Sequence, residues 1–152
     1  MNAPKELFQS TQIIYYALIG GVLMMAGVIS FLSMPFKELS IDFSDPYTLV
    51  AIFVALGSIS ISSVLYSQRK EKHSSIKTAE EAVVDYRSGL ILRVAPLEGA
   101  ALCSIILLFL TNNPFMLLPA ALCLFGMLTS RPSLQGLQTT YNLSDAEMRK
   151  FY

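Results

Sequence analysis

The sequence contains few charged residues, 14% of its 152 positions, whereas soluble domains usually carry about 25%. Lysine and arginine together number 11, as do aspartate and glutamate, so the formal net charge is zero. A neutral chain has no overall positive field with which to bind nucleic acid. Hydrophobic residues make up 53% of the sequence, and the mean hydropathy is +0.53. The composition therefore predicts a single domain that lies mostly in lipid.

Residues that bind metals or carry covalent chemistry are also scarce. The two cysteines, Cys103 and Cys123, lie in apolar segments and lack the Cys-x-x-Cys spacing of zinc or redox sites. The one histidine, His73, lies in a charged stretch with no neighbours that complete a metal set. No nucleophile is paired with a base in the pattern that catalysis needs. We therefore predict no metal site, no cofactor and no enzymatic activity.

Long apolar runs dominate what remains. They cover residues 13–36, 47–66, 90–110 and 114–128, and the first two contain no charged residue. A helix needs about 20 apolar residues to cross a bilayer. The apolar core of a signal peptide is about 7–15 residues long, and the first run is longer and is followed by no cleavage site, so we expect it to remain as a helix. The predicted fold is an all-α integral membrane protein with four transmembrane helices, arranged as two helical hairpins.

The polar stretches are a connector at 67–89 and a tail at 129–152. Thr78 followed by Glu81 predicts a helix start through a capping box. Apolar residues then recur at helical spacing, which predicts either an amphipathic helix on the membrane surface or a stalk leading into the third run. In the tail, Ser144 and Glu147 form a second capping-box pattern that predicts a short helix at 145–152.

The third run is interrupted by Arg93, Pro96 and Glu98. Proline favours the first turn of a helix, and an acid there complements the helix dipole. The membrane helix therefore begins either near residue 90 or at Pro96. From Pro96 it would be only roughly 22 Å long, and the second hairpin then either spans the membrane or enters and leaves on one side.

Basic residues are distributed unevenly. With four spans, the termini and the connector share one side and hold nine of the eleven basic residues: Lys5, Arg69, Lys70, Lys72, Lys77, Arg87, Arg131, Arg149 and Lys150. The opposite side holds only Lys37, and the eleventh, Arg93, lies at the membrane edge on the same side as the nine. The positive-inside rule then predicts a protein of the cytoplasmic (inner) membrane with both termini in the cytoplasm. Within this set, Arg69, Lys70 and Lys72 immediately follow the second span, where they fix the topology and can contact anionic lipid headgroups.

Glu98 is the main candidate site residue, since ionisable groups inside a membrane are expensive. We predict an intramembrane charged cluster of Arg93, Glu98 and Arg131. Arg93 and Glu98 are five residues apart and do not share a face of a regular helix, so a break at Pro96 or a contact with Arg131 must join the charges. Glu98 is then a structural ion-pair or capping acid, a proton or cation site, or a contact to a partner subunit.

Small residues at four-residue spacing let helices approach closely. Ala17 with Gly21 and Ser58 with Ser62 form such pairs, and Gly99 is a further packing candidate. The pairs indicate packing within the chain or between copies, and the serines could also line a polar pathway.

The second half of the chain carries a recognisable pattern. It reads Leu-Arg-x-Ala-x-Leu-Glu-Gly-x-Ala-Leu at 92–102, Thr-Asn-Asn at 111–113, Arg-Pro at 131–132 and Asn-Leu-Ser-x-x-Glu at 142–147. Over about the last 60 residues, this resembles a group of small bacterial four-helix membrane proteins, most without an assigned activity. The resemblance implies that Arg93, Glu98, Gly99, Asn113 and Arg131 act together. A carboxylate in a membrane helix also resembles the rotor proteolipids of ATP synthases, although their dense glycine repeat is missing here.

The sequence thus favours a non-enzymatic accessory subunit or scaffold of a membrane complex. Its expected partners are the lipid bilayer and either other membrane subunits or further copies of itself. The alternative is an oligomer that conducts protons, ions or small solutes through Glu98.

Overall fold

The computed structural model describes residues 4–70 and 78–151, and their regular structure is entirely helical, without β-strands. The long helices are α1 (Pro4–Leu32), α2 (Pro46–Lys70) and α3 (Ala79–Thr111). The 3-10 turn η2 (Pro114–Met116) leads into α4 (Leu117–Thr129), and α5 (Leu134–Tyr141), α6 (Asp145–Met148) and η3 (Arg149–Phe151) complete the chain. The first three helices are each long and apolar enough to cross a membrane. This confirms the all-α, membrane-compatible part of the prediction.

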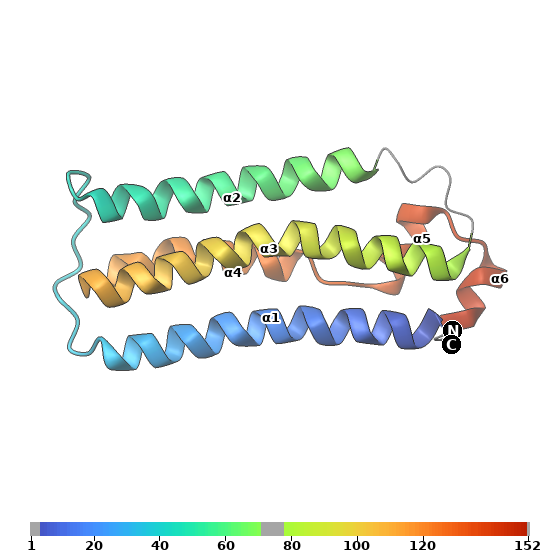
Figure 1. The fold of residues 1–152 in the computed structure, drawn as a ribbon, viewed down its shortest axis with the longest axis horizontal. Coiled ribbons are helices and arrows are strands. Elements are labelled where there is room, and N and C mark those ends of the chain that lie inside the picture. Colours follow the sequence, from blue (N-terminus) through green and yellow to red (C-terminus); the bar gives the residue numbers. More distant parts are fainter. Residues whose placement is uncertain (1–3, 71–77, 152) are drawn as a thin grey trace.

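The long helices run side by side, with α3 between α1 and α2 and with α4 packed behind α3 (Figure 1). Both ends of the chain lie at the same end of this bundle, together with α5 and α6 (Figure 1). We call this the terminal end. The opposite end, formed by residues 33–45 and the turn between α3 and η2, is the loop end.

Helix boundaries follow local capping chemistry. The Thr78 hydroxyl accepts a hydrogen bond from the Glu81 N–H at 3.4 Å, as the capping-box pattern predicts. At the other end of α3, Asn112 adopts the left-handed conformation (φ 55°) that commonly ends helices. Asn113 then caps η2 and donates a hydrogen bond to the Ser40 carbonyl at 2.8 Å. That bond ties the long 33–45 loop to the turn after α3.

Helix α3 is continuous through Pro96, so the alternative of a helix that starts at Pro96 is wrong, and the helix begins at Ala79. Proline lacks the N–H that would bond the carbonyl four residues earlier, which weakens the preceding turn. In that turn the Arg93 carbonyl accepts a hydrogen bond of 2.7 Å from the Ser62 hydroxyl on α2. This bond joins α2 to α3 three residues before Pro96.

The connector is likewise not a separate amphipathic helix in the described residues. Residues 79–89 form the first turns of α3, which corresponds to the stalk alternative. The tail also differs from its prediction: α6 is shorter, continues as η3, and is preceded by the unpredicted α5. The fourth apolar segment, Pro114–Thr129, meets α5 at a bend of 70°.

The core lies along α3. Apolar side chains from α1, α2, α3 and α4 form its central cluster, including Tyr15, Val22, Ala55, Ala101, Ile105 and Met127. A second cluster at the terminal end joins the starts of α1 and α3 to the tail: Phe8, Ala82, Val83, Leu137, Tyr141 and Phe151 belong to it. This terminal cluster holds α5, α6 and η3 against the bundle.

The outer surface of the bundle is strongly apolar. Phe31, Met24 and Phe53 are 76%, 70% and 70% exposed, and Leu56, Ile61 and Phe125 are also exposed. Soluble monomers rarely present apolar patches of this extent. This apolar surface, together with the length of the helices, suggests a membrane location.

Candidate functional site

The structure separates the predicted charged cluster into two parts. Arg93 lies over the ring of Tyr66, with its guanidinium carbon 4.7 Å from the ring centroid. Because α3 does not break at Pro96, Arg93 and Glu98 remain about 140° apart around the helix. Arg93 and Arg131 line one cavity together, and Glu98 does not line it. The two arginines therefore form one candidate site and Glu98 another.

Glu98 is half-buried on α3. It forms no hydrogen bond or ion pair with any residue that the structure describes. Next to it, Gly99 is exposed, and a Cβ there would meet nothing within 4 Å. The space around this part of α3 is therefore open, and a carboxylate stands at its edge in an otherwise apolar stretch.

The cavity that the two arginines share, which we call the arginine cavity, has a volume of about 170 Å³. Its walls come from α2, α3, the end of α4 and α5, and include Tyr66, Arg93, Arg131, Ser133, Thr140 and Tyr141. No carboxylate is among the described residues that line it. Tyr86 stabilises the wall, since its hydroxyl accepts a hydrogen bond from the Ser133 N–H at 3.3 Å. The arrangement is suited to binding an anion.

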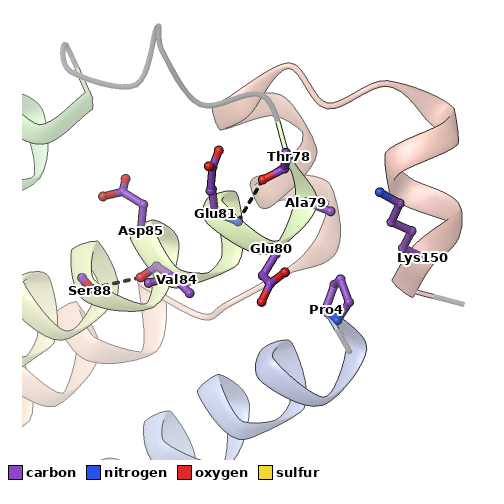
Figure 2. Close-up of a pocket in the computed structure, with 9 residues that line it drawn as sticks. All are labelled: Pro4, Thr78, Ala79, Glu80, Glu81, Val84, Asp85, Ser88 and Lys150. Carbon is purple, nitrogen blue, oxygen red and sulfur yellow. Dashed lines mark hydrogen bonds between the residues drawn. The ribbon is translucent and has the colours of Figure 1, made fainter. Parts of the chain in front are cut away.

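A wider groove of about 820 Å³ lies at the terminal end, where Pro4, the start of α3 and Lys150 meet (Figure 2). Its α3 wall carries Glu80, Glu81 and Asp85. Thr78 and Glu81 in this wall form the helix cap described above (Figure 2). No group of three or more histidine, cysteine or acidic side chains in the described chain is placed to hold a metal. The α3 wall of the groove is therefore acidic, and Lys150 is the basic residue that also lines the groove.

The tail is joined to the start of α3 by Glu147. Its Oε2 accepts a hydrogen bond from the Ala79 N–H at 2.8 Å, and its Oε1 accepts one from Lys150 Nζ at 2.6 Å. The capping-box pattern correctly places Ser144, whose hydroxyl accepts from the Glu147 N–H. The Glu147 carboxylate, however, reaches a different helix 68 residues away. Lys150 first, and then the Ala79 N–H, hold the pKa of Glu147 below its ordinary value.

This contact predicts a pH dependence of the terminal end. A depressed folded pKa means that the stabilisation is complete above the unfolded value of about 4.3 and is lost as the pH falls through the folded pKa. We expect the amide proton shift of Ala79, followed by NMR, to change across that acidic window. Glu147→Gln should abolish the change, whereas Asp145→Asn, two residues away, should preserve it. An unaltered titration in Glu147→Gln would contradict the assignment.

The small-residue pairs are placed differently from each other. Ala17 and Gly21 are exposed, and a Cβ added at Gly21 would meet nothing within 4 Å. Ser58 and Ser62 are buried. The Ser58 hydroxyl donates to the Ala55 carbonyl at 2.8 Å and lies 3.7 Å from the Cys123 sulfur. The buried serines thus pack against α3 and α4, and the α1 pair faces outward.

The predicted headgroup-binding residues can be placed only in part. Arg69 and Lys70 are the last two residues of α2, and Lys72 and His73 lie outside the described residues.

Two features were missed from the sequence, helix α5 and the arginine cavity. Helix α5 has a local sequence signal that could have predicted it, with Ser133 at its N-cap and Asn142 at its C-cap. The arginine cavity has no such signal, because its residues come together from four elements.

The chain matches no protein-family model, no curated protein and no solved structure. Assignment of function therefore depends on the sites themselves.

Proposed function

We propose that the protein is a non-enzymatic subunit of a bacterial inner-membrane complex, in which it serves as an accessory or scaffold component. In this proposal α1, α2, α3 and the segment Pro114–Thr129 cross the membrane, and the terminal end faces the cytoplasm. The distribution of basic residues supports that orientation, since Arg87, Arg131 and Arg149 lie toward the terminal end, and Lys37 lies in the loop at the other end.

Glu98 is the observation that carries the proposal. A carboxylate without a partner in a lipid-facing stretch is costly, and such groups normally pair with another polar group. The described part of the chain supplies no such group. A neighbouring membrane helix that brings a basic or hydrogen-bonding side chain would supply one, and the exposed Gly99 beside it would allow that helix to approach closely. The partner is another subunit or a second copy of the chain.

Substitution of Glu98 tests this directly. We expect Glu98→Gln to lower recovery of the co-purifying partner, or of the homo-oligomer, about tenfold, which corresponds to about 1.4 kcal/mol. The measurement is affinity purification from native membranes in a mild detergent, followed by mass spectrometry and native mass determination. Glu80→Gln, on the aqueous part of the same helix, is the matched control. A strictly monomeric wild type without a stoichiometric partner would refute the proposal.

Proton or ion conduction by an oligomer is the second candidate, and the unpaired Glu98 favours it as well. It predicts a proton flux in liposomes that Glu98→Gln abolishes. Equal flux from wild type and variant would reject conduction while leaving the subunit role intact.

A further inference from the structure

The arginine cavity lies at the level where the apolar segments of several helices end. Tyr66 is the last residue before the polar end of α2, and Thr129 is the last residue of α4. The length of η2 and α4 places the cavity roughly 25 Å from the loop end. If a hydrocarbon layer about 30 Å thick begins at the loop end, the cavity lies just inside its opposite boundary, next to the headgroup region.

The charges in the cavity are all of one sign. Arg93 and Arg131 form no ion pair with any residue that the structure describes, and no carboxylate lines the wall. The Tyr66 ring lies against Arg93 and holds the guanidinium plane in place. A guanidinium held in this way keeps its N–H groups available at its edge for bidentate bonds to an oxyanion.

Neutral donors complete the site. The Ser133 hydroxyl accepts from the Gly136 N–H at 3.0 Å, which leaves its own proton free to donate. Thr140 lines the same wall and makes no hydrogen bond through its side chain to the described residues. Ser133 is the N-cap of α5 and Gly136 lies in its first turn, so the positive end of this helix adds to the field at the cavity. Since a water molecule occupies about 30 Å³, about 170 Å³ accommodates a phosphate group with a few waters.

From this geometry we infer that the arginine cavity binds a phosphate group, either on the headgroup of an anionic phospholipid or as free phosphate. Arg93 and Arg131 hold the oxyanion, and Ser133 and Thr140 donate hydrogen bonds to it. The site is independent of Glu98 and of the proposed partner contact. It also differs from the predicted surface contact of Arg69, Lys70 and Lys72 with lipid, because it is a walled cavity formed by tertiary structure.

Native mass spectrometry of the full chain in a neutral detergent tests the inference. The probes are phosphatidic acid, phosphatidylcholine and inorganic phosphate. We expect wild type to retain one phosphatidic acid and to bind it at least tenfold more tightly than phosphatidylcholine. The double variant Arg93→Gln/Arg131→Gln should lose at least tenfold in that affinity. The matched double variant Arg87→Gln/Arg149→Gln removes the same charge outside the cavity and should bind as wild type.

Competition between phosphatidic acid and inorganic phosphate distinguishes a lipid headgroup from free phosphate as the ligand of the cavity. Displacement of the lipid by millimolar inorganic phosphate assigns the site to free phosphate, and retention of the lipid assigns it to a headgroup. Equal losses in the two double variants, or equal binding of both lipids, would overturn the inference. If the first double variant does not fold, Arg131→Gln alone, at an exposed position, must still weaken phosphatidic acid binding about threefold or more.

Discussion

Phe8→Ala should detach the tail from the bundle and cost about 3–5 kcal/mol, the usual range for removing a buried aromatic side chain. Phe8 is only 5% exposed and lies at the centre of the terminal cluster. Its ring centroid is 6.5 Å from that of Tyr86 and 6.3 Å from that of Phe151. Because this cluster holds α5, α6 and η3, we expect faster hydrogen exchange at 134–151, while α1–α3 keep their protection.

Phe31→Ala is the matched control for this prediction. It removes the same side chain from the same helix, at a position that is 76% exposed. No cavity forms there, so the exchange rates at 134–151 should stay at the wild-type values. Since Tyr86 contacts Phe8 and also lines the arginine cavity, Phe8→Ala should additionally weaken phosphatidic acid binding. Unchanged exchange in Phe8→Ala would show that the tail is held by other contacts.

Ala101→Leu should destabilise the helical core by about 1–3 kcal/mol. Ala101 is 0% exposed and lies in the central cluster, where α3 packs against its neighbours. Lipid is as apolar as leucine, so helices in a bilayer associate through close packing rather than through the hydrophobic effect. An added isobutyl group therefore separates the helices without a compensating gain in burial. Thermal unfolding in detergent, monitored by circular dichroism, measures the loss.

Ala95→Leu provides the comparison on the same helix. Ala95 is exposed, so the larger side chain extends into the surrounding lipid or detergent. Its unfolding midpoint should remain at the wild-type value. Equal destabilisation by both substitutions would indicate that helix α3 itself, rather than its packing, limits stability.

The two candidate sites show where sequence reasoning reaches its limit. The sequence identifies Arg93, Glu98 and Arg131 as unusual because charges are rare in apolar runs. It cannot establish which of them meet, since that depends on whether Pro96 breaks the helix. The Ser62 hydroxyl, from another helix, bonds the backbone beside the proline. Helix α3 is continuous, so Arg93, which lies over Tyr66, and Glu98 are on different faces of it.

The sequence by itself determined the all-helical character, the approximate positions of the long apolar helices and the helix starts at Thr78 and Ser144. These features depend on hydropathy and on hydrogen bonds between residues close together in the chain, so they can be predicted from local patterns. Only the tertiary structure decided that α3 runs unbroken, that Glu147 caps it from the tail, and that two arginines share a cavity. Those contacts join residues far apart in the sequence, and their energies depend on the packing of whole helices, which no local pattern records.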